Sequence, residues 1–275
     1  MAKFDHVVIV TDMDGTFLGS DGCPVERNVR AIEAFKREGG HFTFATGRMH
    51  GDFLIMMPEL AGLANAPAIL VNGAYLYDFA ERRVIEAHYL DTALVQELQR
   101  LIDRDYPSLG FRATTETGFL TENLTGLIAR DLRRMREITR VISVETWGEV
   151  HCYKAVARGD AAELSRLRAD AERRWPGVFS LTCSSHDILE FMPRGVSKAT
   201  LLECLRDCCA MDEQPPVIYA VGDYENDYAM LRAADVAVCP TNAMPMIREI
   251  AAICPASNDE GVIAALIEVI EARLE

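Results

Sequence analysis

Short apolar runs alternate with amphipathic segments in the first part of the chain. Residues 4–11 read Phe-Asp-His-Val-Val-Ile-Val-Thr, and residues 41–46 and 68–71 have a similar, mostly apolar pattern. Runs of this length predict strands that are buried on both faces, as in a parallel sheet. Residues 24–38 predict an amphipathic helix, and residues 49–63 a mostly helical stretch. The order strand, helix, strand, helix, strand is typical of a doubly wound α/β fold.

The pattern changes after residue 74 and returns at residue 196. A hairpin is expected at residues 75–89, and the pattern of the start resumes with a helix at residues 197–211 and a buried strand at residues 217–221. This organisation predicts a discontinuous Rossmann-like core with a parallel sheet, residues 1–81 and 193–275, and an inserted α+β domain, residues 82–192. The insert's strand candidates are residues 111–121, 141–147, 152–157, 179–183 and 188–192, and its helix candidates are residues 91–106, 125–136 and 160–175.

Composition and charge narrow the class of protein. No stretch approaches the ~20 apolar residues of a membrane span, and the start lacks the apolar region of a secretory signal. A formal net charge of -14 argues against a general nucleic-acid binder. We therefore expect a cytoplasmic protein that binds neither a membrane nor nucleic acid, either as a monomer or as a homodimer. The pair Arg133-Arg134 is interpreted as part of a solvated helix face, and the eight cysteines, which form no CxxC pair, as reduced thiols.

Two acidic residues follow the first predicted strand, in the run Asp12-Met13-Asp14-Gly15-Thr16. Open α/β sheets bind ligands at the carboxyl ends of their strands. Because side chains alternate along a strand, Asp12 and Asp14 are expected on one side, roughly 6–7 Å apart along the chain. Gly15 can adopt a positive φ, and the N–H groups after it can form an anion-binding nest. Two close carboxylates suit a division between an ionised nucleophile and a protonated acid; the alternative is a polar loop that only closes the strand.

Polar residues also follow the second and third predicted strands, as Thr46-Gly47-Arg48 and Asn72-Gly73. The Thr46 hydroxyl can donate to a phosphate oxygen or cap the following helix, and the residues do not decide between the two. Arg48 can likewise pair with phosphate or cover the start of that helix. Asn-Gly is a favoured hairpin turn, so Asn72 either forms a turn alone or also points its amide into a site.

The returning core brings two further candidates. Lys198 stands at the start of the predicted helix, where its ammonium group can reach phosphate oxygens or remain solvated. Asp223 follows a buried strand in the run Gly222-Asp223-Tyr224-Glu225-Asn226-Asp227 and can bind a hard cation such as Mg²⁺. Asn226 can instead be an N-cap, with Asp227 favoured near the helix start. The crowded acidic residues would repel one another without a cation, which favours metal binding.

The motifs DMDGT, ATGR, a lysine after a long insert and GDxxND, in this order, resemble those of the haloacid dehalogenase superfamily of phosphotransferases. The Asn72-Gly73 turn, the insert before Lys198 and the run GDYENDYAML resemble its Cof-type, sugar-phosphatase-like subgroup. The resemblance covers the whole chain and is weakest in the insert, which would be a cap domain. It implies that Asp12 attacks phosphorus, and that Asp14 protonates the leaving oxygen and then deprotonates water.

The same resemblance implies the binding residues. Thr46 and Lys198 would bind the transferring phosphoryl group, and Mg²⁺ would be held by Asp12, the Asp14 main-chain carbonyl and Asp223. The remaining candidates are Gly47 and Asn72 for phosphate, Asn226 for the metal, and Asp227 and Arg48 in supporting roles.

The expected function is hydrolysis of a small phosphorylated metabolite, with sugar phosphates as the first candidates, through an aspartyl-phosphate intermediate and with Mg²⁺ as cofactor. Two alternatives use the same residues. A phosphomutase would pass the phosphoryl group to another hydroxyl instead of water, and a non-catalytic sensor would only bind the phosphometabolite.

Overall fold

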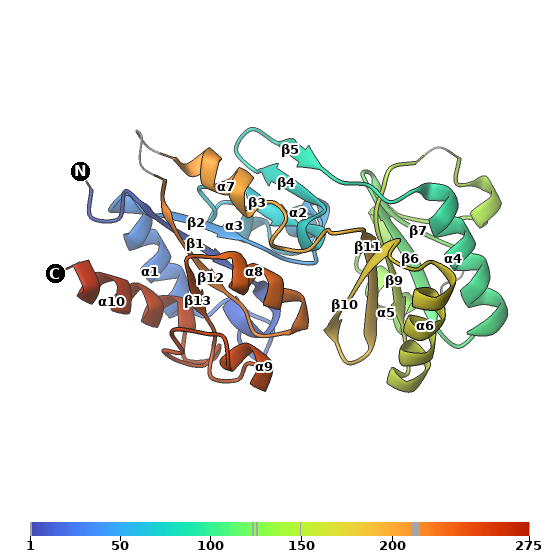
Figure 1. Cartoon of the computed structure of the whole chain (residues 1–275). Coiled ribbons are helices and arrows are strands. Elements are labelled where there is room, and N and C mark those ends of the chain that lie inside the picture. Colours follow the sequence, from blue (N-terminus) through green and yellow to red (C-terminus); the bar gives the residue numbers. More distant parts are fainter. Residues whose placement is uncertain (1, 123, 125, 149, 211–214, 275) are drawn as a thin grey trace. The chain divides into compact units, whose positions relative to one another are not determined.

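The computed structural model describes residues 2–122, 124, 126–148, 150–210 and 215–274 (Figure 1). The chain divides into two compact units, which we call the core unit and the cap unit. The core unit comprises Met1–Met49, Met57–Glu86 and Ser197–Glu275, and the cap unit comprises His50–Met56 and Ala87–Val196. The sequence placed the insert at residues 82–192; the cap unit is shifted from these bounds by a few residues and also takes in residues 50–56.

A four-stranded parallel sheet runs through the core unit in the order β13-β12-β1-β2. Its central strand β1 has the fully buried residues Val8, Ile9 and Val10, as its apolar run predicted. Thr11 pairs with Val221 on one side and with Phe44 on the other, so three strands end at the same edge of the sheet. The four strands are β1 (Val7–Thr11), β2 (His41–Phe44), β12 (Val217–Val221) and β13 (Val236–Val238).

Helices pack on this sheet as a doubly wound fold requires. Residues of α7, α8 and α9 form one buried cluster with Val8 and Val10 of β1, and α1 packs along α10 elsewhere in the unit. The predicted Rossmann-like parallel core is confirmed. These helices are α1 (Glu26–Arg37), α7 (Leu202–Cys209), α8 (Tyr228–Ala233), α9 (Pro245–Arg248) and α10 (Val262–Leu274). The helix predicted at residues 197–211 begins later than expected, and residue 211 lies outside the described residues.

The third predicted strand differs from the expectation. It forms β3 (Ala68–Leu70), which pairs antiparallel with β4 (Tyr75–Asp78), and β4 is followed in the same sheet by β5 (Arg83–Ala87). A single parallel bridge between Ala45 and Ile69 connects β3 to the end of β2. The predicted helical stretch at residues 49–63 is divided into α2 (His50–Met56) and α3 (Pro58–Ala61).

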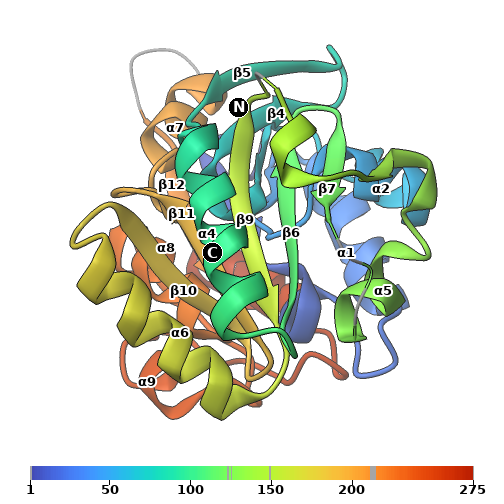
Figure 2. The ribbon, with the colours of Figure 1, turned by 90° about the vertical axis from the view of Figure 1, so that its right-hand side faces the viewer.

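The cap unit is an α+β domain, as predicted. Helices α4 and α6 lie over one face of a six-stranded sheet of order β10-β11-β9-β6-β7-β8 (Figure 2). Each of these helices begins with an aspartate cap, Asp91 or Asp160, whose carboxylate accepts two backbone N–H groups of the first turn. The elements are α4 (Thr92–Asp105), β6 (Gly110–Thr115), β7 (Gly118–Thr121), α5 (Gly126–Leu132), β8 (Thr139–Val141), β9 (Cys152–Arg158), α6 (Ala161–Arg174), β10 (Phe179–Ser185) and β11 (Ile188–Pro193).

One strand predicted in the insert is wrong. The pattern at residues 141–147 indicated a strand, but β8 ends at Val141 and Val144–Thr146 form a 3-10 turn. The Glu122 carboxylate accepts the Val144 N–H at 3.1 Å, and Trp147 packs into the cluster under the helices. The apolar residues of this segment are therefore buried without sheet pairing. The helix predicted at residues 125–136 covers α5, with residue 125 outside the described residues.

The sequence predicted that the chain has no membrane span and that its cysteines are reduced. Within the described residues, every helix is too short or too polar to cross a lipid bilayer. All eight cysteines are described, and each is a free thiol.

Candidate active site

Asp12 is the first residue after β1 and lies at the carboxyl edge of the core sheet. Its N–H donates to the Val221 carbonyl at 2.8 Å, so the neighbouring strand fixes its backbone. Asp14 does not continue the strand as expected, because residues 13–17 form a short helical turn in which Gly15 has a φ of 83°. A Cβ at Gly15 would lie 2.6 Å from Asp223 Oδ2, so a side chain at this position would push the two loops apart.

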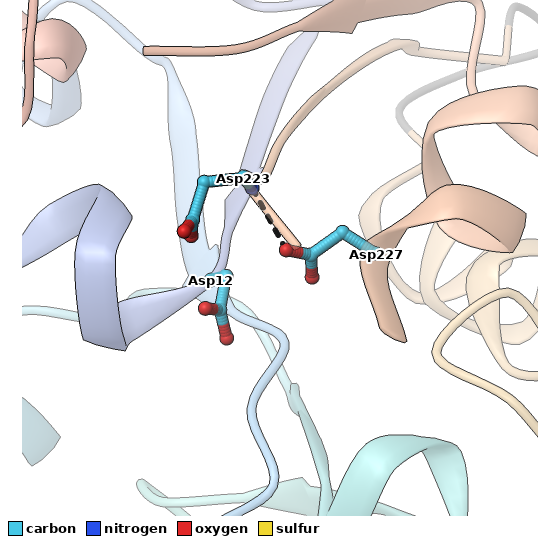
Figure 3. A group of neighbouring side chains, drawn as sticks. All are labelled: Asp12, Asp223 and Asp227. Carbon is cyan, nitrogen blue, oxygen red and sulfur yellow. Dashed lines mark hydrogen bonds between the residues drawn. The ribbon is translucent and has the colours of Figure 1, made fainter. Parts of the chain in front are cut away.

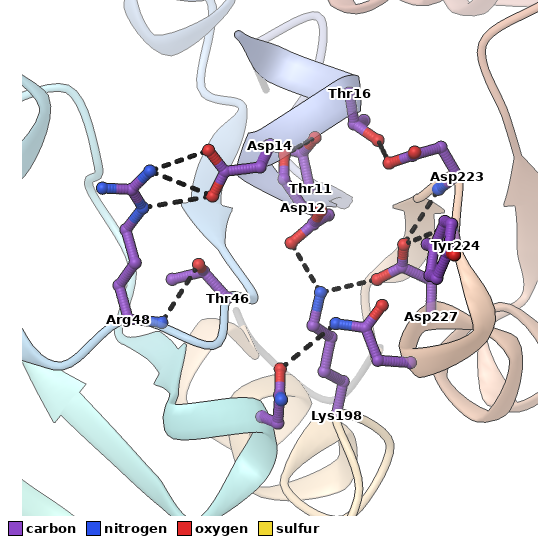
Figure 4. Close-up of polar contacts among 12 residues, drawn as sticks. Thr11, Asp12, Asp14, Thr16, Thr46, Arg48, Lys198, Asp223, Tyr224 and Asp227 are labelled. Carbon is purple, nitrogen blue, oxygen red and sulfur yellow. Dashed lines mark hydrogen bonds and ion pairs between the residues drawn. The ribbon is translucent and has the colours of Figure 1, made fainter. Parts of the chain in front are cut away.

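Lys198 is a fully buried cation at the centre of the site. Its Nζ donates to Asp12 Oδ1 at 2.5 Å and to Asp227 Oδ1 at 2.6 Å (Figure 4). Burial lowers the pKa of this ammonium group, but the two carboxylates more than offset that effect and hold the pKa above its ordinary value. From the sequence we predicted Lys198 at the start of a helix. In the structure Lys198 lies in the turn before α7, which begins at Leu202.

Asp223 and Asp227 lie on the loop after β12. Asp227 is fully buried, and its Oδ2 accepts the N–H groups of Asp223 at 2.8 Å and Tyr224 at 3.1 Å. The same carboxylate therefore shapes the loop and holds Lys198. A Cβ at Gly222 would lie 2.4 Å from the Asp227 carboxyl carbon, which leaves room for glycine alone at that position.

Three carboxylates share this site with one lysine. One oxygen from each of Asp12, Asp223 and Asp227 lies within 4.8 Å of the other two (Figure 3). Burial raises the pKa of Asp12 well above its usual range and raises the pKa of Asp223 to about 7, and the nearby Asp227 carboxylate adds to both effects. Because one ammonium group cannot neutralise three carboxylates, the site favours a further cation. Oxygen ligands alone suit a hard divalent ion such as Mg²⁺.

Asp14 and Arg48 form an ion pair beside this cluster. Arg48 donates to both carboxylate oxygens of Asp14 at 2.7–3.2 Å, and the Asp14 side chain is 64% exposed. Figure 4 shows the Asp14 carboxylate turned toward Arg48 and that of Asp12 turned toward Lys198. The sequence did not decide whether Arg48 binds phosphate or covers the start of a helix. In the structure Arg48 contacts Asp14, the residue predicted to act as acid and base.

Thr46 is buried in the loop after β2, followed by Gly47. Its N–H donates to the Ile69 carbonyl and its carbonyl accepts the Asn72 N–H, both at 2.9 Å, so the loop is held between β3 and the turn after it. Thr46 Oγ1 accepts the Arg48 N–H at 3.3 Å. Because α2 begins only at His50, the helix-cap alternative is not what the structure shows.

Asn72 both forms a turn and faces the site. It has a φ of 55° in the turn that joins β3 to β4, and its Oδ1 accepts Asn226 Nδ2 at 3.3 Å. Asn226 Oδ1 is buried and has no hydrogen-bond partner among the described residues. Buried polar atoms are normally satisfied, so this oxygen is suited to a cation or to a ligand donor.

Two residues that had no predicted role also contact the site. The Thr16 hydroxyl donates to Asp223 Oδ1 at 2.6 Å, and Asn242 Nδ2 donates to the Gly15 carbonyl at 2.9 Å. Thr16 is the last residue of the DMDGT motif, and its hydroxyl group could have indicated a hydrogen bond to a neighbouring loop. Asn242 follows β13 outside every motif, and only the fold brings it to Gly15.

The whole chain, core and insert, has known relatives. The sequence profile of the haloacid dehalogenase-like hydrolases matches residues 9–267. The pyridoxal phosphate phosphatase YbhA of Escherichia coli (strain K12) is 26% identical, over 94% of this chain and 97% of that protein. Among solved structures, a haloacid dehalogenase-like hydrolase from Bacteroides thetaiotaomicron has a TM-score of 0.82 at 22% identity, covering 96% of this chain and 98% of its own. The subclass IIB sugar phosphatase BT4131 has a TM-score of 0.79 at 18% identity, covering 95% and 98%. The fold is therefore shared over the full length.

Gly73 offers a test of how closely the chain segments meet at this site. A Cβ at Gly73 would lie 1.9 Å from the Ser197 carbonyl oxygen, beside Lys198, and its φ is 92°. Gly73→Ala should destabilise the core unit by roughly 2–5 kcal/mol, from the positive φ together with the backbone clash. Urea unfolding followed by circular dichroism measures this effect.

Gly22→Ala is the matched control, since Gly22 has a φ of 76° but nothing within 4 Å of an added Cβ. Gly22→Ala should lower the free energy of unfolding by only about 1–2 kcal/mol, because alanine is strained at a positive φ. Equal losses in the two variants would contradict the close approach of Gly73 to Ser197.

Proposed function

This chain belongs to the haloacid dehalogenase-like hydrolase family, and we propose that it is a Mg²⁺-dependent phosphatase that hydrolyses small phosphomonoesters through an aspartyl-phosphate on Asp12. The observation that carries the proposal is the buried group of Asp12, Asp223 and Asp227 around a single lysine. Sugar phosphates are the first substrates to test, because the whole-length structural relative BT4131 is a sugar phosphatase.

Asp12 is the proposed nucleophile. Among the described residues its carboxylate accepts one side-chain hydrogen bond, from Lys198 to Oδ1, which leaves Oδ2 as the oxygen that attacks phosphorus. Lys198 lowers the pKa of Asp12 against the larger effect of burial, and it stands beside the position that the transferring phosphoryl group would occupy. A covalent phosphoryl-aspartate divides one difficult displacement into two easier ones.

The carboxylate group also fits the cofactor. Asp12 and Asp223 would hold Mg²⁺ with the Asp14 main-chain carbonyl, Asn226 would add its unpartnered Oδ1, and Asp227 would orient the loop. The bound ion would supply electrostatic stabilisation of the charge that spreads over the phosphoryl oxygens. Thr16 would hold the Asp223 carboxylate in place through its hydrogen bond to Oδ1.

Asp14 is the proposed general acid and base. For this role its exposed carboxylate must leave Arg48 and turn toward the leaving oxygen of the substrate. Arg48 would then lose this ion pair and is a candidate contact of the phosphorylated substrate. Thr46, Gly47 and Asn72 lie on the two loops beside Lys198 and would complete the phosphate site with hydroxyl, N–H and amide donors.

Asp12→Asn should reduce phosphate release to background across a panel of phosphomonoesters with Mg²⁺, because an amide cannot form the phosphoryl intermediate. Asp21→Asn is the control, since Asp21 is an exposed aspartate of the nearby loop, and it should retain full turnover. A panel on which the unaltered protein releases no phosphate would refute the phosphatase. Isomerised product without net phosphate release would instead indicate a phosphomutase.

Asp14→Asn should separate the phosphorylation of Asp12 from the hydrolysis of the phosphoryl-aspartate. Turnover of a sugar phosphate should fall by about 10²–10⁴-fold, because the leaving alkoxide needs a proton. With p-nitrophenyl phosphate, whose leaving group needs no acid, the variant should give a stoichiometric burst of nitrophenolate and trap a phosphoryl group on Asp12. Mass spectrometry of the Asp12 peptide detects this group, and an Asp14→Asn enzyme with unimpaired steady turnover would remove Asp14 from the mechanism.

Thr16→Val should raise the Mg²⁺ concentration that gives half-maximal activity by about 10–100-fold, because Asp223 loses the hydrogen bond that orients it. Thr16→Ser keeps the hydroxyl and serves as the control, with a near-normal Mg²⁺ requirement. Chelation of divalent ions should abolish the activity of all three proteins. A Thr16→Val enzyme with an unchanged Mg²⁺ requirement would contradict the assignment of Asp223 as a ligand.

A further inference from the structure

A cavity of about 510 Å³ in the cap unit is lined by four arginines: Arg130, Arg133, Arg134 and Arg158. Its volume is in the range of small-molecule sites, which measure roughly 300–1,000 Å³. The sequence interpretation treated Arg133-Arg134 as part of a solvated helix face. The structure instead places both residues around a concave space with two further guanidinium groups.

Three of these arginines come from the end of α5 and the turn that follows it. In α5, Ile128 and Leu132 are four residues apart and both are buried, which fixes the inward face of the helix. Arg130 lies between them in the helix, and Arg133 and Arg134 lie in the turn directly after its last residue, Leu132. All three line the same cavity, so their like charges repel one another.

The arginines of the cavity differ in their partners. Arg158 pairs with Asp187 at 2.9 Å. No described carboxylate pairs with Arg130, Arg133 or Arg134, although all three are exposed. Other arginines of the cap unit do have acidic partners, among them Arg100, Arg104, Arg166 and Arg173. Among the described side chains, the three arginines therefore gather positive charge without a paired carboxylate.

We propose that this cavity is an anion site of the cap unit, which binds a small anion with two linked phosphate groups, of the pyrophosphate type. Guanidinium groups bind phosphate oxygens through paired N–H donors. One phosphomonoester carries a charge of about −1.5 to −2, so three unbalanced arginines call for more than one phosphate group. The chain's overall charge of -14 opposes a long polyanion such as nucleic acid, which leaves a small ligand.

Calorimetric titration of pyrophosphate into the full chain tests the site. The titration uses the Asp12→Asn background at low salt and without divalent ions, so that neither turnover nor a metal–pyrophosphate complex contributes. Arg133→Gln with Arg134→Gln should weaken binding by about tenfold or more, because charge-assisted hydrogen bonds are lost. Inorganic phosphate should bind the unaltered cavity about tenfold or more weakly than pyrophosphate, for the same reason.

Arg136→Gln with Arg140→Gln is the matched control. These two arginines belong to the same segment and are exposed, but they do not line the cavity. The control removes the same charge and should leave the affinity for pyrophosphate nearly unchanged. Equal weakening by both pairs would show diffuse charge in place of a site, and undetectable binding or equal affinity for inorganic phosphate would also overturn the proposal. None of these outcomes bears on the phosphatase reaction, because no turnover is measured.

Discussion

The burial of one ammonium group among three carboxylates is the constraint on which this structure depends. Removing charged groups from water costs several kcal/mol each, and the cost is offset only where the groups find well-placed partners. Lys198 meets this condition with Asp12 and Asp227, at 2.5 and 2.6 Å. Asp227 meets it with the two backbone N–H groups of its own loop as well. For Asp12 and Asp223 the cost of burial is not fully offset, which raises the pKa of both carboxyl groups and supports the proposal that a cation binds beside them.

Close packing of the backbone is what brings these charges together. Gly15 in the loop after β1 lies against Asp223, Gly73 in the turn after β3 lies against Ser197, and Gly222 lies against Asp227 of its own loop, and an added Cβ would collide at each of them. Two of these contacts involve a charged residue directly, since Gly15 faces Asp223 and Gly222 faces Asp227. Gly15 and Gly222 therefore affect the electrostatics of the site, because they set how near the carboxylates can come, whereas Gly73 lets the turn after β3 approach the backbone beside Lys198.

The sequence predicted the features that depend on local pattern and general topology. β1, β2 and β12 were found because they are buried apolar runs, and the residues after them meet because parallel strands end at one edge. The antiparallel pairing of β3 with β4 was not predicted, although β3 also has the expected parallel neighbour through the bridge between Ala45 and Ile69, since a three-residue apolar run has the same pattern in a parallel or an antiparallel sheet. The contacts of Lys198 with Asp227, and of Asn242 with Gly15, join residues that are 29 and 227 positions apart. No local pattern encodes such pairs, and they became visible only in the folded chain.

The two units treat charge in opposite ways. The core unit concentrates carboxylates around a lysine at the end of a parallel sheet, whereas the segment around α5 carries five arginines and only two acidic residues between positions 126 and 140. Neither cluster improves the stability of an isolated chain, because like charges held close together repel. The core cluster fits the phosphoryl transfer proposed above, in which a cation would lie beside a reactive carboxylate. By the same reasoning, the arginines of this segment favour a negatively charged ligand, since no carboxylate among the described side chains pairs with Arg130, Arg133 or Arg134.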